Sequence, residues 1–271
     1  MSWVDFIAQG LHATGLPQRR PAPGPLVVMY HGIGGDDGVN PEAFAVQLEL
    51  LTEQRRVLPL EDALAYLGKS EAGDLAAVTF DDAYRDFAES ALPILEDRKL
   101  HATLFVPVGH IGAHNVWDEG ARPRRFILGT EELRALPREQ VALGVHGLTH
   151  RRLTGLAPEV LHTETALAKQ ELQDLLGYEV SLFAYPYGQR DDFDAVAETA
   201  VREAGFLAAC STCFGRGSRP EERFRLRRVG IEPQDSLAVV ARKLSGAYDW
   251  LGGKEWAGSE IRKLRKRVGT T

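Results

Sequence analysis

Five short apolar runs in this sequence are each followed by, or carry, polar side chains that can do acid–base or metal chemistry. In a barrel of parallel strands, side chains at the C-terminal strand ends converge on one mouth. The sequence therefore predicts two carboxylates and three imidazoles around one site, a set typical of a metal-dependent hydrolase. In chain order, the side chains are His31, Asp81 with Asp82, His146 with His150, Tyr187 after Pro186, and Arg227 with Arg228.

The carboxylate pair Asp81-Asp82 follows the apolar run 75–80. Adjacent residues of an extended chain point to opposite sides, but the turn after a strand can bring both carboxylates toward one cavity. One of them could then bind a cation while the other takes a proton. The alternative is that one aspartate caps a helix that begins near Ala83.

The sequence His146-Gly-Leu-Thr-His150 is the stronger signal. Histidines four residues apart lie on one face of a helical turn, so we expect both rings to bind one ion. With an aspartate they would form a ligand set of two imidazoles and one carboxylate, which leaves positions open for water and substrate. We expect one divalent metal, with Zn²⁺ as the first choice and Ni²⁺, Co²⁺ or Mn²⁺ as alternatives.

The rest of the chain supplies elements that would position these groups. Strand-like runs and helical segments alternate about seven times, which is typical of parallel strands with right-handed crossovers. We predict an α/β fold, a single distorted (β/α)7-type, TIM-like barrel over residues 26–235, with an N-terminal arm (1–25) and a C-terminal helix and basic tail (236–271). The predicted strands are 26–30, 56–58, 75–80, 101–106, 141–145, 181–185, 207–210 and 226–231.

Helix boundaries are marked by capping residues. Asn40 before Pro41 indicates an N-cap followed by a first-turn proline. Further helices are predicted at 83–95, 130–136, 158–176 and 192–204, the last two closed by Gly177 and Gly205. Residues 107–140 are long for a connection and could form part of a substrate rim; an ordinary surface excursion is the equally weighted alternative.

Composition narrows the choice of partners. The net charge of −6 gives no indication of a nucleic-acid binder. No apolar run approaches the roughly 18 residues of a membrane span, and the N-terminus lacks the features of a signal peptide, so we expect a cytoplasmic location. The basic stretch Ile261–Arg267 could contact an anionic membrane surface, although a solvated face or frayed tail is more common. Cys210 and Cys213 could be a redox or zinc motif, but two small residues at a strand end are the simpler interpretation.

Three motifs in order resemble the polysaccharide deacetylases, the family of the chitooligosaccharide deacetylases (carbohydrate esterase family 4). Thr79-Phe80-Asp81-Asp82 is similar to the first motif of that family, although Ala83 replaces its usual glycine. His146-Gly-Leu-Thr-His150 matches the second motif, and Phe183-Ala-Tyr-Pro-Tyr-Gly188 matches the third in the form that lacks its usual arginine. The resemblance covers most of residues 26–232.

The resemblance implies a role for each residue. Asp82, His146 and His150 would hold the metal, and Asp81 would be the general base on a metal-bound water. The backbone N–H of Tyr187 would stabilise the oxyanion formed when an acetamide carbonyl is attacked.

Two departures from the family pattern remain. Many members supply the general acid as a histidine near the C-terminus, but no histidine follows His162 in this chain. His31 resembles the first-strand Tyr-His of exopolysaccharide deacetylases and is the candidate for the general acid. The alternative is that His31 only shapes the pocket. Ala184 stands where the third motif usually has an arginine that orients the base. Arg228 could do this from the next strand end, with Arg227 pointing the other way.

The expected activity is hydrolysis of an N-acetyl group, less readily an O-acetyl group, from an acetylated sugar or glycan. Two rivals are an amide hydrolase acting on a small non-carbohydrate amide and a catalytically silent sugar-binding relative. The intact set Asp81, Asp82, His146 and His150 argues against the silent relative.

Overall fold

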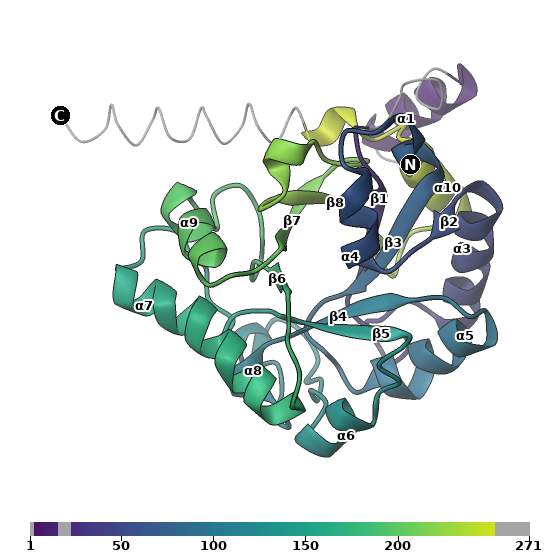
Figure 1. The fold of residues 1–271 in the computed structure, drawn as a ribbon. Helices are drawn as coiled ribbons and strands as arrows, with labels where there is room; N and C mark the ends of the chain where they lie inside the picture. Colours follow the sequence, from purple (N-terminus) through teal and green to yellow (C-terminus); the bar gives the residue numbers. More distant parts are fainter. Residues whose placement is uncertain (1–2, 16–22, 253–271) are drawn as a thin grey trace.

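A closed barrel of seven parallel strands forms the centre of the molecule (Figure 1). The structure, a computed structural model, describes residues 3–15 and 23–252. Neighbouring strands pair around the ring in the order β1-β8-β7-β6-β5-β4-β3, and β3 pairs back to β1, while the short β2 pairs with the start of β3. The predicted barrel is therefore confirmed. Its strands are β1 (Leu26–Tyr30), β2 (Arg56–Val57), β3 (Leu75–Phe80), β4 (Ala102–Val106), β5 (Val141–Val145), β6 (Leu182–Ala184), β7 (Ala208–Phe214) and β8 (Leu226–Gly230).

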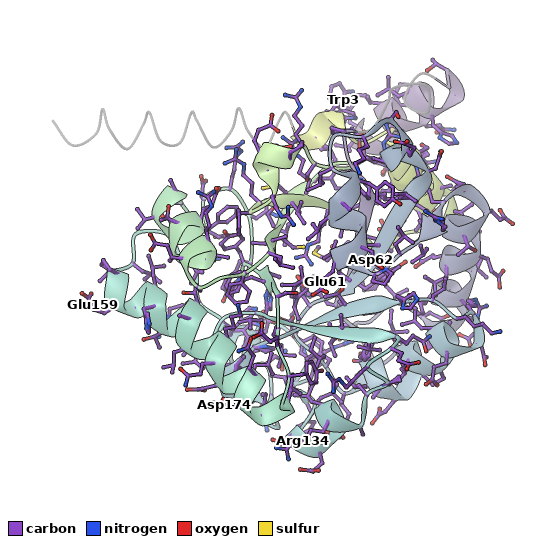
Figure 2. All side chains as sticks on the ribbon, viewed as in Figure 1. Trp3, Glu61, Asp62, Arg134, Glu159 and Asp174 are labelled. Carbon is purple, nitrogen blue, oxygen red and sulfur yellow. The ribbon has the colours of Figure 1, made fainter. Side chains whose placement is uncertain are left out.

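Helices surround the barrel on its outside (Figure 1). Residues of β1 and β3 are buried along their whole length, because both faces of these strands are covered. Charged side chains such as Arg134, Glu159 and Asp174 point outward from the helices into solvent (Figure 2). The α-helices are α1 (Trp3–Ala13), α3 (Pro41–Gln54), α4 (Leu60–Ala63), α5 (Leu92–Asp97), α6 (Thr130–Ala135), α7 (Pro158–His162), α8 (Ala168–Leu176), α9 (Ala195–Glu203) and α10 (Leu237–Ser245).

Local capping signals set several of these boundaries as predicted. The Asn40 side chain accepts a hydrogen bond from the Ala43 N–H at 3.0 Å and so begins α3. A π-helical segment, Thr163–Leu167, joins α7 to α8, so one helical stretch runs from Pro158 to Leu176. It ends at Gly177, whose φ of 76° is the left-handed conformation that glycine adopts at little cost.

Aromatic packing fixes the first strand of the barrel and its neighbours. The Tyr30 ring lies 5.0 Å from Phe44 of α3 and 5.5 Å from Phe80 at the end of β3. Phe80 in turn meets Phe87 edge to face at 4.9 Å. Because Tyr30 and Phe80 immediately precede His31 and Asp81, this cluster anchors the backbone at two positions of the predicted site.

The helix predicted over 83–95 is wrong at its start. The backbone is left-handed at Asp82 (φ 70°) and at Ala83 (φ 48°), and helical structure begins at Phe87. The chain instead pairs with residues 126–128, since Arg85 N–H donates to the Phe126 carbonyl and Ala83 accepts from Leu128. No helix begins at Ala83, so the capping alternative for the aspartate pair is excluded.

Near the chain ends, α1 packs on α10 and the turn that follows it. Tyr248 Oη donates to Asp5 Oδ1 at 2.7 Å, and Ala8 is buried against Ala247. The predicted basic tail, residues 261–267, lies outside the described residues, so its membrane contact stays a prediction. Among the helices described, none has the length and apolarity to cross a bilayer.

Candidate active site

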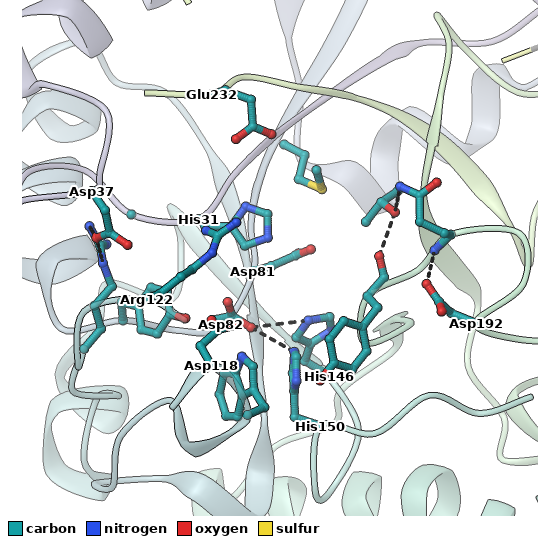
Figure 3. A pocket seen from close by; sticks show the side chains of 18 of the residues that line it. His31, Asp37, Asp81, Asp82, Asp118, Arg122, His146, His150, Asp192 and Glu232 are labelled. Atoms are coloured by element: carbon teal, nitrogen blue, oxygen red, sulfur yellow. Dashed lines mark hydrogen bonds and ion pairs between the residues drawn. The ribbon is translucent and has the colours of Figure 1, made fainter. Parts of the chain in front are cut away.

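A pocket of about 320 Å³ is lined by the residues that follow the carboxyl ends of the strands (Figure 3). Two acidic residues follow β3, two histidines follow β5, and single residues follow β1 and β6, so the barrel brings together groups far apart in sequence. Six of the seven predicted site residues line this pocket: His31, Asp81, Asp82, His146, His150 and Tyr187. The seventh, Arg228, lies fully buried behind Asp81.

Asp82, His146 and His150 form one compact cluster of potential ligand atoms. Each residue offers one atom, and these atoms lie within 4.8 Å of one another. Asp82 Oδ1 is 3.5 Å from His146 Nε2 and 3.2 Å from His150 Nε2, and all three side chains are buried. The structure therefore brings together the three residues that the sequence analysis named as metal ligands.

The hydrogen bonding in this cluster fits a cation. His146 Nδ1 donates to the Ala184 carbonyl at 2.8 Å, so Nε2 of the neutral ring turns a lone pair toward Asp82. Asp82 Oδ1 is buried and has no hydrogen-bond partner in the described part of the chain. A lone pair facing a carboxylate oxygen is repulsive, and a divalent cation between them removes the repulsion. The donor set of two imidazoles and one carboxylate is one that zinc accepts.

The protonation states favour the same interpretation. Burial alone would raise the pKa of Asp82, but the neighbouring imidazoles of His150, His31 and His146 hold it well below its usual range. Burial lowers the pKa of His146 to about 4, although Asp81 and Asp82 oppose this. Near neutral pH the site therefore presents an ionised carboxylate and a neutral imidazole, the forms that bind metal.

The turn that carries both histidines is not the helical turn expected from their spacing. After β5 the chain turns through Gly147 (φ 73°) and reaches His150 in the left-handed region (φ 53°). The buried Glu164 holds this turn, because its carboxylate accepts from Leu148 N at 2.9 Å and from Thr149 N and Oγ1 at 3.0 and 2.5 Å. The two histidines come together because hydrogen bonds to Glu164 hold the loop between them, not because they share one face of a helix.

Asp81 is clamped by a buried arginine. Arg228 Nη1 and Nη2 donate to the two Asp81 carboxylate oxygens at 2.7 and 2.6 Å, and Arg228 Nε donates to the Ser211 carbonyl at 2.8 Å. Burial would raise the pKa of Asp81, but the guanidinium and the nearby His146 and His31 lower it below its ordinary value. Arg228 thus occupies the expected place beside the carboxylate, and Arg227 points away to Glu222.

His31 and Tyr187 flank the cluster without belonging to it. His31 lines the pocket near Asp81 and Asp82, as Figure 3 shows, and lies outside the group of metal-ligand atoms. Tyr187 has a φ of 60°, and its ring lies 5.1 Å from that of His150 and 4.0 Å below the Arg152 guanidinium. The structure therefore places both side chains at the pocket, and their catalytic roles stay predictions.

The long segment 107–140 lines one side of the pocket through Trp117, Asp118, Arg122 and Arg125. Arg125 ties this side to the loop after β1 through Asp37, at 2.5 Å, and to the segment after β3 through Asp86, at 2.7 Å. The segment therefore forms one side of the pocket, and its contact with a substrate stays a prediction.

Sequence reasoning missed Trp117 and Glu164, which approach the histidine turn from other parts of the chain. The sequence signals that could have found them are weak. Trp117 is a large aromatic residue within a predicted loop, and Glu164 is a charged residue on the apolar side of a predicted helix. Neither cysteine belongs to a cluster of metal-ligand atoms in residues 3–15 and 23–252; Cys210 is buried in β7, and burial raises the pKa of its thiol to about 12.

Known proteins share both sequence and fold with this chain. The sequence profile of the polysaccharide deacetylase family matches residues 68–209. YxkH of Bacillus subtilis (strain 168), assigned to the polysaccharide deacetylases, is 24% identical over 220 residues, which are 79% of this chain and 74% of YxkH.

Two solved structures have the same fold. The deacetylase PplD of Streptococcus pyogenes, solved in complex with acetate, superposes with a TM-score of 0.69 at 22% identity, over 82% of this chain and 99% of PplD. IcaB of Ammonifex degensii superposes with a TM-score of 0.69 at 24% identity, over 83% of this chain and 98% of IcaB. With the family profile spanning both the aspartate pair and the histidine turn, the chain belongs to the polysaccharide deacetylase family.

Proposed function

We propose that this protein is a metal-dependent hydrolase that removes an N-acetyl group from an acetylated sugar or glycan and releases acetate. The observation that carries the proposal is the contrast between two adjacent carboxylates at the end of β3. Asp82 faces two imidazole nitrogens, whereas both oxygens of Asp81 are held by Arg228. One carboxylate is placed to bind a cation, and the other is kept ionised to accept a proton.

Asp82, His146 and His150 would hold the cation, with zinc as the first choice for this donor set. When bound, a divalent cation lowers the pKa of water and polarises the carbonyl of the acetyl group. Every other role in the reaction falls to side chains and backbone groups around the pocket.

Asp81 accepts the proton of the attacking water, because the Arg228 pair keeps it anionic and fixes its orientation. The backbone N–H of Tyr187, whose ring lies 5.1 Å from that of His150, donates to the oxyanion that forms at the acetyl carbon. His31 protonates the departing nitrogen, since an imidazole can serve as a general acid and this one lies outside the ligand cluster. Cleavage of the carbon–nitrogen bond then leaves acetate and the free amine of the sugar.

The test begins with metal analysis of the purified protein, followed by acetate release from N-acetylated sugars, from acetylated oligosaccharides and from small non-sugar amides. His150→Ala should lose most of the metal, and Asp81→Asn should keep metal and fold but lose activity by a factor on the order of 10² or more. The matched controls are His162→Ala on α7 and Asp174→Asn on α8, which are both exposed.

Each rival predicts a distinct outcome. Acetate release from non-sugar amides alone would identify the small-amide hydrolase. Sugar binding without acetate release in the metal-loaded protein would identify the silent relative. Full metal content in His150→Ala would refute the assigned ligand set.

A further inference from the structure

The two histidines of the ligand cluster differ in what fixes their rings. His146 Nδ1 is hydrogen-bonded to the Ala184 carbonyl at 2.8 Å. His150 Nδ1 is buried and has no hydrogen-bond partner within the described residues. Histidines that bind metals almost always use the second ring nitrogen for such a bond, which sets the ring orientation. Some other contact must therefore orient the His150 ring.

Trp117 makes the contact best suited to this purpose. Its ring lies 3.9 Å from that of His150 with an interplanar angle of 22°, so the two rings are stacked. The neighbouring rings of His146 and Tyr187 are farther away, at 4.9 and 5.1 Å, and are steeply inclined, at 69° and 57°. The χ2 torsion of an imidazole has a broad minimum, and a parallel indole opposes its rotation because a turned ring would clash with the indole face.

The position of Trp117 is set independently of the ligand cluster. Asn115, two residues before Trp117, is buried. Its side chain accepts a hydrogen bond from Arg125 N at 2.7 Å and donates one to the Pro123 carbonyl at 3.1 Å. The His110 ring lies 5.2 Å from that of Trp117 and meets it edge to face. The loop that carries Trp117 is thus held by its own hydrogen bonds, so the indole can restrict rotation of the His150 ring.

We propose that Trp117 is a positioning residue for the metal site: its stacked indole holds the His150 imidazole with Nε2 facing Asp82. The indole fixes the ring orientation of His150, as the hydrogen bond to the Ala184 carbonyl fixes that of His146. The proposal rests on the metal site of the proposed function and adds a determinant of its affinity. It assigns to the segment 107–140 a role in metal binding besides its place on the pocket rim.

The experiment measures Zn²⁺ affinity of the metal-free full chain by competition with a chromophoric chelator. Trp117→Leu, which fills space without stacking, should weaken Zn²⁺ binding by about tenfold to a hundredfold, the usual effect of losing such a support. Trp117→Phe keeps a stacked ring and should retain most of the affinity. Trp3→Leu is the matched control, because Trp3 is 74% exposed on α1, and it should bind Zn²⁺ as the wild type does.

Co²⁺ substitution gives a second readout that reports ligand geometry directly. The visible absorption bands of bound Co²⁺ should shift in Trp117→Leu and remain close to wild type in Trp117→Phe. Should the leucine variant fail to fold, as judged by thermal unfolding of the metal-free protein, Trp117→Ala takes its place as the variant without a stacked ring. Wild-type Zn²⁺ affinity and an unaltered Co²⁺ spectrum in folded Trp117→Ala would overturn the proposal, whereas weakened Zn²⁺ binding beside near wild-type binding in Trp117→Phe supports it.

Metal binding and acetate release separate this proposal from the proposed function. Wild-type Zn²⁺ affinity in Trp117→Leu, with a raised KM for the glycan, would make the indole a sugar-stacking surface and overturn the positioning role. Weakened Zn²⁺ binding in Trp117→Leu supports the positioning role even where the wild-type protein releases no acetate from any sugar tested.

Discussion

Replacing Arg228 by methionine tests the link between the buried ion pair and the proposed base. The guanidinium is fully buried and makes two charged hydrogen bonds to Asp81, at 2.7 and 2.6 Å. Hydrogen bonds to charged groups contribute about 1.5–3 kcal/mol each, and removing one partner of a buried pair costs about 3–5 kcal/mol. We expect Arg228→Met to lower the free energy of unfolding by about 3–5 kcal/mol at pH 7.

The pH dependence of this loss has a defined sign. In the wild type the folded-state pKa of Asp81 lies below its ordinary value, so its stabilising contribution is present at neutral pH and is lost as pH falls through the folded-state pKa. Without Arg228, burial dominates and the pKa of Asp81 rises. The variant should therefore recover part of its lost stability as the pH is lowered from 7 toward 5, and the acid limb of its pH–rate profile should move to higher pH.

Urea unfolding of the metal-free protein at several pH values measures the effect, and a double-mutant cycle assigns it. Arg228→Met with Asp81→Asn removes both charges and should cost less than the sum of the single changes. Arg227→Met is the matched control, since that arginine is 35% exposed and pairs with Glu222, and it should cost at most about 1 kcal/mol. A loss below about 1 kcal/mol for Arg228→Met, with an unmoved acid limb, would refute the reasoning.

Three further predictions concern the groups around this pair. His31→Ala should bind metal normally and slow amide hydrolysis strongly while slowing activated esters much less; equal losses on both substrates would reduce His31 to shaping the pocket. Glu164→Gln replaces the charged acceptor of the Leu148 and Thr149 N–H groups with a neutral amide and should lower both the unfolding free energy, by about 1–3 kcal/mol, and the Zn²⁺ affinity; an unchanged chelator titration would contradict this. Ala83→Gly should leave the unfolding free energy within about 0.5 kcal/mol of wild type, because glycine adopts a φ of 48° without steric cost. The matched change Ala197→Gly in α9 should lower the unfolding free energy by about 1 kcal/mol in the same urea assay.

The sequence by itself determined the barrel and which residues would gather at its mouth. Buried parallel strands need continuous apolar runs, so β1, β3 and β5 have the predicted bounds. The cap at Asn40 follows from local chemistry, because its side chain bonds to an N–H three residues away. Alternation along β8 was enough to send Arg228 inward to Asp81 and Arg227 outward to Glu222.

Only the tertiary structure determined the backbone conformation of the turns that line the mouth of the barrel. The turn at Asp82 and Ala83 is left-handed because the chain pairs there with residues 126–128, a contact more than 40 residues away in sequence. The histidine spacing suggested a helical turn, but the actual turn is held by Glu164 and faces Trp117. Spacing along the chain encodes only neighbours on the same element. The hydrogen bonds and ring stacking that fix a loop come from segments that meet it when the barrel closes, and their positions depend on the whole packed structure.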